Sequence, residues 1–433
     1  MSNNEILSWI RQSSPYIRAH RDKTFVINIP GEAVSSPEFT QLIHDLALLN
    51  AMGIKLVICH GARPQIEEQL SSNGIQSQYI NGIRVTDSQT LTAVIQASCK
   101  VRLQIESLLS MGLANSVMAG AEIRVVSGNF VTARPVGVRD GVDFLYTGTV
   151  RSIDAEGLQR QVSNGNIVVL SPIGYSPTGE VFNITAEEIN SSTAQVLNAE
   201  KAVFITNRAE LPKAVRALRE IELADAKRLL DGEKHLQTRH NFEVAIAACE
   251  NGVRRVHFLD MQKPGALLLE LFTRDGSGMM ISADLYEDLR QARIDDVGGI
   301  LELIAPLEEK GILVRRSRQK LETEISHFLI MERDGMIIAC AAYFPFKAEK
   351  VAELACLAVH SSYLRTGRGQ ALLTAVEKRA RMDGIEQLFV LTTQTSHWFL
   401  ERGFIEKTVQ DLRVSNQQTY NFKRNSKVLV KVV

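Results

Sequence analysis

The stretch Tyr363-Leu-Arg-Thr-Gly-Arg-Gly-Gln-Ala-Leu-Leu373 joins a predicted strand to a predicted helix. Residues 351–359 before it are apolar and few enough for a buried strand, and residues 370–383 after it carry apolar side chains at helical spacing. Gly367 and Gly369 lack Cβ, so backbone N–H groups can point at a phosphate while the helix N-terminus adds its positive end. The pattern predicts a pyrophosphate cradle, although a tight turn before an ordinary helix fits the same residues.

Two downstream stretches extend this pattern. The strand-like run Gln387-Leu-Phe-Val-Leu-Thr-Thr393 leads into His397-Trp-Phe-Leu-Glu-Arg-Gly-Phe404, an aromatic helix that ends in Gly-Phe. With the glycine turn they resemble the GNAT superfamily of N-acetyltransferases, whose acetyl-CoA pyrophosphate loop reads Gln/Arg-x-x-Gly-x-Gly/Ala. The first loop position is Leu364 here, with Arg365 one place later, and the family's frequent tyrosine acid is Phe399.

Length and charge limit the class of protein. A chain of 433 residues exceeds one ordinary domain, so we expect two domains with separate cores. Lys and Arg total 49, as do Asp and Glu, which argues against nucleic acid or an anionic membrane as the main partner. The sequence shows neither the apolar core of a signal peptide nor a membrane-spanning run, and we expect a soluble protein.

The cysteines point to a reducing compartment. They are scattered, mostly within apolar runs, and form neither a CxxC pair nor a cluster with histidine at metal-ligand spacing. We therefore expect a cytoplasmic protein without a metal. The five positions are Cys59, Cys99, Cys249, Cys340 and Cys356.

Strands and helices alternate from residue 24 to about 273, which predicts an α/β sandwich with parallel strands and helical crossovers. A glycine-rich stretch followed by a charged segment near residues 282–292 marks the domain boundary. We place the domains at residues 1–285 and 286–433. Predicted strands cover residues 24–29, 55–60, 167–170, 202–206 and 255–258, and predicted helices cover 37–52, 186–200 and 211–230.

The first half resembles the amino acid kinase family, acetylglutamate kinases in particular, a three-layer α/β sandwich. The resemblance is carried by Val57-Ile-Cys-His-Gly-Ala-Arg-Pro-Gln-Ile66, Asn81-Gly-Ile-Arg-Val-Thr-Asp87 and Asn183-Ile-Thr-Ala-Glu187. The family's first glycine turn carries a lysine that holds the transferred phosphate, but Asn28 stands there, with Glu32 close by. Because phosphoryl transfer needs cationic charge at that point, and Arg63 fills the second turn, we predict a kinase fold without kinase activity.

Two distant segments resemble the arginine site of arginine-inhibited acetylglutamate kinases. These are Ser14-Pro-Tyr-Ile-Arg-Ala-His20 and Glu270-Leu-Phe-Thr-Arg-Asp-Gly-Ser-Gly278. By that resemblance Glu270 accepts the effector's cationic end, backbone near Gly276 and Gly278 completes the pocket, and Tyr16 and Lys201 touch its other end. The alternative is that Tyr16 packs an interface and Glu270 sits on an exposed helix end.

A kinase-like arginine sensor joined to an acetyltransferase resembles the fused bacterial N-acetylglutamate synthases over nearly the whole chain. The reaction implied is acetyl transfer from acetyl-CoA to L-glutamate, the first step of arginine synthesis, with feedback inhibition by L-arginine. Kinase-like domains with such an N-terminal helix often assemble, so the resemblance implies a homo-oligomer such as a hexamer. Two alternatives stay open: a bifunctional synthase and acetylglutamate kinase, and a decayed arginine-binding regulator.

Transfer to an amine requires that the ammonium lose a proton, and Glu353 is the predicted general base. It is the sole acid in residues 351–359, where partial burial raises a carboxyl pKa; an edge carboxylate facing solvent is the alternative. With Phe399 unable to donate, Thr392 is the predicted acid toward the sulfur, unless it is an ordinary strand residue. The predicted acetyl-CoA contacts are Cys356, Leu357, Val359, Arg365, Gly367, Arg368 and Gly369.

Backbone amides at Cys356 or Leu357, on a splayed strand, are the predicted donors to the tetrahedral intermediate, and Cys356 itself is predicted to be a core thiol. Glutamate carries two carboxylates, which arginine forks hold well. By resemblance to the synthases the predicted substrate contacts are Arg316, Arg424 and Ser426, whereas the neighbouring Arg315 and Arg318 fit a solvated helix face.

Overall fold

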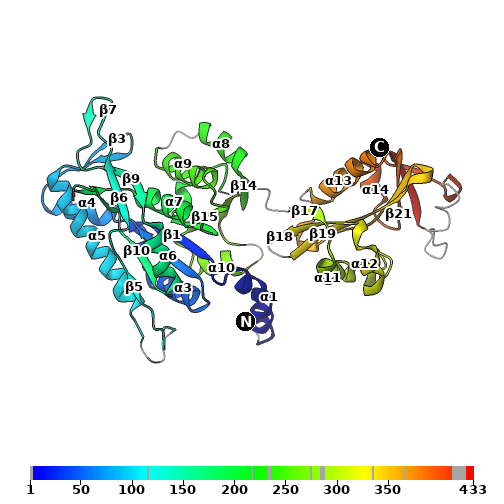
Figure 1. The fold of residues 1–433 in the computed structure, drawn as a ribbon, viewed down its shortest axis with the longest axis horizontal. Helices are drawn as coiled ribbons and strands as arrows, with labels where there is room; N and C mark the ends of the chain where they lie inside the picture. Colours follow the sequence, from blue (N-terminus) through cyan, green and yellow to red (C-terminus); the bar gives the residue numbers. More distant parts are fainter. Residues whose placement is uncertain are drawn as a thin grey trace. The chain divides into compact units, whose positions relative to one another are not determined.

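The computed structural model describes residues 3–112, 114, 117–216, 218–232, 236–273, 276–282, 288–333, 336–364, 367–411 and 426–433. The chain divides into two compact units, Met1–Leu285 and Tyr286–Val433 (Figure 1). Within the described residues, no helix combines the length and the apolar character that crossing a bilayer requires.

An eight-stranded sheet forms the centre of the first unit. Neighbouring strands are parallel except for one antiparallel pair, β15 with β16. In spatial order the strands are β14 (Glu220–Glu222), β16 (Met279–Ser282), β15 (Arg255–Asp260), β13 (Lys201–Thr206), β1 (Thr24–Ile29), β2 (Lys55–His60), β10 (Ile167–Leu170) and β5 (Val125–Val126).

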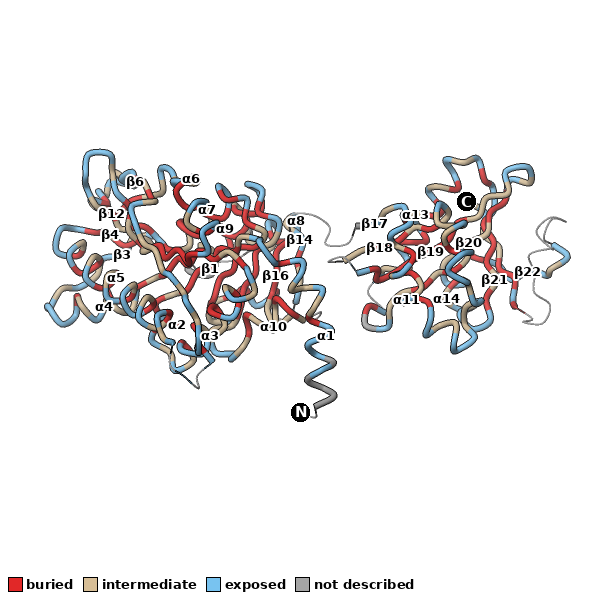
Figure 2. The backbone as a smooth tube through the Cα atoms, turned by 60° about the horizontal axis from the view of Figure 1, so that its bottom comes forward, coloured by how far each residue is buried: buried red, intermediate tan, exposed pale blue. Residues whose placement is uncertain are grey.

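Helices cover both faces of this sheet, because its buried strands send alternate side chains to opposite sides. Phe25 and Ile27 of β1 join one hydrophobic core, and Val26 joins the other. Figure 2 shows the buried strands between these layers, which confirms the predicted three-layer sandwich. The first core contains residues of α3 (Phe39–Ala51), α4 (Arg63–Ser72), α5 (Ser88–Leu109) and α10 (Ala266–Phe272); the second contains residues of α6 (Ala155–Ser163), α7 (Ala186–Val196), α8 (Leu223–Gly232) and α9 (Leu236–Glu250).

The predicted helix over residues 211–230 is wrong in its first half. Pro212 has no backbone N–H and disfavours a helical conformation at Leu211, and a turn follows it. The chain then forms the edge strand β14, in which Ile221 is buried opposite Ile281, and only α8 continues as helix. The predicted helix 186–200 likewise ends earlier, at Val196.

Smaller elements complete the first unit. The helix α1 (Asn3–His20) precedes β1, and the single turn α2 (Gly31–Val34) follows it. A second, four-stranded sheet contains β12 (Val181–Asn183), β11 (Ile173–Tyr175), β6 (Val131–Pro135) and β9 (Gly148–Ile153). Two hairpins are formed by β3 (Gln78–Ile80) with β4 (Ile83–Val85), and by β7 (Val138–Arg139) with β8 (Val142–Asp143).

The second unit is built on a seven-stranded sheet that is antiparallel except between β20 and β21. Its strand order is β17 (Asp288–Gln291), β18 (Phe328–Arg333), β19 (Met336–Phe346), β20 (Val351–Val359), β21 (Gln387–Thr392), β23 (Lys427–Val432) and β22 (Ile405–Lys407). One core contains α11 (Val297–Glu309) and α12 (Arg318–Glu324), and another contains α13 (Arg368–Met382) and α14 (Ser396–Leu400), so helices pack on both faces.

Candidate functional site

The second unit has an opening in its sheet where β20 and β21 separate. These parallel strands pair at Val351 with Gln387, Ala352 with Leu388 and Glu353 with Phe389, and the described residues of β20 beyond Glu353 have no partner on β21. On the other side, the register with β19 shifts around Cys356, which takes a φ of 51°. Cys356 and Leu357 therefore form a bulge against β19 and also lie beyond the end of the β21 ladder.

Glu353 lies at the base of this opening and is partly buried. Burial raises the pKa of its carboxyl above the ordinary 4.5, because desolvation penalises the charged form. The nearby Arg316 opposes that rise, and Glu324 adds to it. The structure therefore places a carboxylate with increased affinity for a proton beside the part of β20 that β21 does not pair.

Arg316 lies close enough to Glu353 to lower the pKa of its carboxyl. Its backbone N–H donates to Oε1 of Glu308 at 2.9 Å, which fixes the loop before α12. Its Nε lies 3.9 Å from Oε2 of Glu324, beyond hydrogen-bond length, and both atoms are buried without a hydrogen-bond partner. The guanidinium thus retains donor capacity next to Glu353, whereas Arg315 and Arg318 are exposed.

The described part of the glycine turn before α13 begins at Gly367. Gly367 caps the helix with a φ of 84°, and a Cβ added there would meet no atom within 4 Å. A Cβ on Gly369 would lie 3.2 Å from Cζ2 of Trp398. Glycine at this position therefore lets the backbone approach the Trp398 ring closely, and its φ is not in the left-handed region. The Arg368 guanidinium lies over the Tyr363 ring, and Arg365 is outside the described residues.

Thr392 ends β21 across the opening from the bulge. Continuing the register of Glu353 with Phe389 sets Thr392 level with Cys356. Its hydroxyl lies 2.9 Å from the Thr395 hydroxyl and accepts the Thr395 backbone N–H. Thr392 pairs with Lys427, so the buried Ser426 lies beside it, while Arg424 is outside the described residues.

In the first unit, Glu270 is the centre of a buried polar cluster. Its Oε2 accepts the backbone N–H groups of Ser277 and Gly278, and its Oε1 lies 2.6 Å from Nδ1 of His257. Gly276 has a φ of 60°, and a Cβ there would lie 2.5 Å from Oε2 of Glu270. The turn therefore wraps the carboxylate, which is not on an exposed helix end.

The sequence reasoning missed His257, which links this cluster to Lys201. The Lys201 Nζ lies 3.5 Å from Nε2 of His257. Because the ammonium only donates and the Glu270 carboxylate only accepts, His257 is neutral with its proton on Nδ1. Burial and then Lys201 lower the pKa of His257, and despite its burial Glu270 has a pKa of about 2, mainly through His257. A polar residue inside the apolar run of β15 was the available signal.

The helix α1 packs against α10, which carries Glu270. Ser13 donates from its hydroxyl to the Phe272 carbonyl, and Nε2 of His20 donates to the Leu271 carbonyl at 2.9 Å. Tyr16 is partly buried against the core that contains α10. The structure thus brings Lys201, Glu270, Gly276 and Gly278 together and anchors the helix of Tyr16 nearby.

The two kinase-like turns meet at the carboxyl ends of β1 and β2. A Cβ on Gly61 would lie 3.1 Å from the Gly31 backbone nitrogen, so the turns are in contact. Asn28 is buried at the end of β1, Glu32 is exposed on α2, and Arg63 reaches the Tyr79 hydroxyl. Among the described residues, no group of three or more His, Cys, Asp or Glu side chains is arranged to hold a metal ion.

Comparison with family models divides the chain in two. Residues 23–260 match the amino acid kinase family, and residues 295–404 match the acetyltransferase (GNAT) family. Two curated relatives named amino-acid acetyltransferase match over the whole length. The protein from Pseudomonas putida (strain GB-1) is 47% identical, and that from Azotobacter vinelandii (strain DJ / ATCC BAA-1303) is 48% identical; each comparison covers 99% of this chain and 100% of the relative.

The fold is also similar to a solved structure over its full length. N-acetylglutamate synthase from Neisseria gonorrhoeae, complexed with coenzyme A and L-arginine, is 37% identical with a TM-score of 0.90, covering 99% of each chain. The same protein complexed with coenzyme A and N-acetyl-glutamate matches with a TM-score of 0.63, covering 98% of this chain and 99% of that one.

Proposed function

The chain belongs to the amino-acid acetyltransferase family, and we propose that it transfers the acetyl group of acetyl-CoA to the α-amino group of L-glutamate, giving N-acetyl-L-glutamate and CoA. The observation that carries this proposal is the opening between β20 and β21, with Glu353 at its base and the Gly367 turn on the same unit. The similar Neisseria gonorrhoeae synthase is complexed with coenzyme A and N-acetyl-glutamate, which supports the choice of both substrates.

Acetyl-CoA fits the residues present. A diphosphate at the Gly367 turn would accept N–H groups from the start of α13 and gain from its dipole. The acetyl group would then lie along the unpaired edge of β20, where backbone N–H groups of Cys356 or Leu357 can donate to the thioester oxygen.

The reaction is a direct transfer. Glu353 removes a proton from the α-ammonium, directly or through one water, and the amine nitrogen attacks the thioester carbon. The negative charge that develops on the oxygen is stabilised by the bulge amides. The C–S bond then breaks, and the Thr392 hydroxyl relays the second proton of the nitrogen to the thiolate: it donates its own proton to sulfur and takes the proton of the nitrogen, which leaves the amide and the thiol of CoA. Phe399 has no hydroxyl, and it packs between Trp398 and Phe404.

Glutamate recognition is assigned to Arg316, Arg424 and Ser426. Arg316 supports this role because its guanidinium lies near Glu353 with an unpaired, buried Nε. A substrate carboxylate would give the Arg316 Nε the acceptor that Glu324, at 3.9 Å, does not provide, and would hold the amine toward the base.

The first unit is assigned to arginine-dependent inhibition. The cluster of Lys201, His257 and Glu270 supplies a buried anionic carboxylate for a guanidinium, and the related synthase is complexed with L-arginine. Kinase activity is disfavoured because Asn28 and Glu32 stand where transferred phosphate would need positive charge.

Release of thiol from acetyl-CoA by the purified chain tests the assignment. Glutamate should stimulate release far more than other amino acids do, and added arginine should reduce it. Equal release with any amino acid would refute the substrate. Phosphorylation of N-acetylglutamate by ATP would instead establish the bifunctional alternative, and absence of thiol release with retained arginine binding would establish the decayed regulator.

A further inference from the structure

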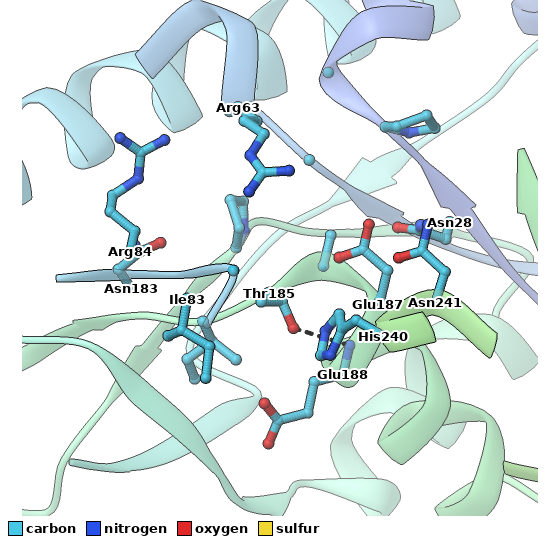
Figure 3. A pocket seen from close by; sticks show the side chains of 18 of the residues that line it. Asn28, Arg63, Ile83, Arg84, Asn183, Thr185, Glu187, Glu188, His240 and Asn241 are labelled. Carbon is cyan, nitrogen blue, oxygen red and sulfur yellow. Dashed lines mark hydrogen bonds between the residues drawn. The ribbon is translucent and has the colours of Figure 1, made fainter. Parts of the chain in front are cut away.

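The kinase-like unit contains a cavity of about 570 Å³ that the proposed function does not use. It lies at the carboxyl ends of β1, β2 and β13, next to the N-terminus of α7 (Figure 3). Its lining residues include Asn28, Glu32, Arg63 and Glu187. Glu270, His257 and Lys201 do not line it, so this cavity is separate from the cluster assigned to arginine.

The lining has more carboxylates than guanidinium groups once pairs inside the protein are considered, with Glu32, Glu187, Glu188 and Glu210 against Arg63 and Arg139. Arg84 is ion-paired with Glu67, and Arg239 with Glu243. The carboxylates of Glu32, Glu187 and Glu210 remain around Arg63 at the end of the cavity nearest β1. No lysine is among the described residues of the lining.

The electrostatics of individual groups agree with this excess of negative charge. Burial raises the pKa of Glu210, and Glu32 and Glu187 raise it further. Burial lowers the pKa of Arg63, but the Tyr79 hydroxyl and the carboxylates of Glu187 and Glu32 outweigh it and raise the value above normal. Near Glu210 the single guanidinium of Arg63 therefore interacts with several carboxylates, and this part of the cavity favours a further cation.

The N-terminus of α7 gives the cavity little attraction for a phosphate. Thr185 caps it through the Glu188 backbone N–H, and Glu187 and Glu188 occupy its first turn. These carboxylates already neutralise the positive end of the helix. A nucleotide would add several negative charges to this region, so the lining disfavours it.

Asn28 provides an independent observation. This side chain lines the cavity, is 2% exposed, and its Oδ1 has no hydrogen-bond partner. A buried acceptor without a donor costs free energy, and a bound N–H group would satisfy it. Asn28 and Glu187 both line this cavity, and Figure 3 labels both of them.

We propose that this cavity binds a small organic cation through a primary ammonium group held by Glu187, Glu32 and the Asn28 side chain. An ammonium has three N–H donors, which match two carboxylates and one amide oxygen. It would occupy the region where the resembled kinases place a lysine ammonium. The former phosphate site is thereby converted into a second ligand site for cations.

Calorimetric titration of the full-length chain with 1,4-diaminobutane tests this inference, with 1,4-butanediol as the uncharged control and ADP as the anionic one. The diamine should bind, and neither control should. Glu187→Gln should weaken binding about tenfold or more, since a charge-assisted hydrogen bond contributes on that order. Glu32 is exposed, so Glu32→Gln is a second variant with little risk to folding and should also weaken binding.

Matched variants locate the site. Glu156→Gln removes an exposed carboxylate on α6, outside the lining, and should leave diamine binding unchanged. Glu270→Gln alters the arginine cluster and should also leave it unchanged. The proposal is overturned if the diamine fails to bind, if butanediol or ADP binds instead, or if Glu270→Gln abolishes binding while Glu187→Gln does not. None of these results depends on acetyl transfer.

Discussion

Glu353 of β20 pairs in register with Phe389 of β21, and it is the last residue of β20 to do so. At this pair the backbone ladder between the two parallel strands ends, and β20 continues without a partner on β21. The carboxyl therefore lies where the two strands separate. This position is the reason for proposing Glu353 as the general base.

Glu353→Gln should lower turnover by about 100-fold or more, because general base catalysis contributes on that order. The amide is of similar size and cannot take the proton. Thiol release from acetyl-CoA with saturating glutamate is the measurement. Glu309→Gln, an exposed position on α11, is the control and should behave as the parent chain does. Unchanged turnover in Glu353→Gln would remove this residue from the mechanism.

The pH dependence of turnover follows from the raised pKa of Glu353. A carboxyl with a raised pKa loses its negative charge at a higher pH than the ordinary 4.5. As the pH is lowered, turnover should therefore begin to fall while the pH is still above 4.5. Glu353→Gln should not show this decrease at acidic pH. An acidic limb that persists in the variant would assign it to another group.

Two substitutions of Thr392 test its hydroxyl separately from the shape of its side chain. Thr392→Ser keeps the hydroxyl and should keep most of the activity. Thr392→Val keeps the shape and should lose about tenfold or more, since the thiolate then lacks a proton donor. Thiol release checks both. Equal rates in the two variants would exclude the hydroxyl as the acid.

Gly367→Ala should weaken CoA binding and destabilise the turn by about 1–2 kcal/mol, because an L-residue with a φ of 84° is strained. Space is not the cause, since no atom lies within 4 Å of the added Cβ. Gly367→Asn is the matched variant, because asparagine tolerates this conformation better, and it should retain more affinity. Calorimetric titration with CoA is the measurement. Affinity equal to the parent in Gly367→Ala would contradict the cradle.

The sequence predicts most of what depends on local pattern. Apolar runs gave β1, β2 and β10 with the bounds observed, and paired glycines located the turn before α13. The separation of β20 from β21 depends on non-local pairing, but a lone Glu353 in an apolar run already indicated its position. Local pattern therefore reached the fold class, and the general base stays a prediction.

Other features depend on contacts that sequence does not encode locally. The edge strand β14 was missed because its three residues become a strand only by pairing with β16. His257 was missed because β15 is apolar around it, and its partners Lys201 and Glu270 lie 56 and 13 residues away. The cavity of Asn28 and Glu187 joins segments that are distant in the sequence.

Glu270 links stability to pH. The pKa of Glu270 is about 2, below the ordinary 4.5. Its contribution to the free energy of unfolding is therefore fully present above pH 4.5 and is lost as the pH falls toward 2. The contribution is on the order of 3 kcal/mol. His257 acts in the same direction, because its lowered pKa means that the unfolded chain takes up the proton first as the pH falls below 6.5.

Glu270→Gln should accordingly lower the midpoint of thermal unfolding of the first unit near neutral pH, and the difference from the parent chain should shrink as the solution is acidified. Scans from about pH 7 to pH 3 measure this. Glu156→Gln is the control, with no pH-dependent difference expected. A difference that stays constant across the range would show that the Glu270 carboxylate is not stabilised by its partners.

His257→Asn should weaken arginine binding about tenfold. The Nδ1 atom of the imidazole lies 2.6 Å from Oε1 of Glu270, and its Nε2 atom lies 3.5 Å from the Lys201 Nζ. Asparagine is shorter and cannot span both contacts, so the carboxylate loses the orientation that a guanidinium fork requires. Titration of the full-length chain with arginine measures the change, and His44→Asn on α3 is the control for loss of an imidazole elsewhere. Arginine affinity equal in all three chains would mean that the effector binds away from this cluster.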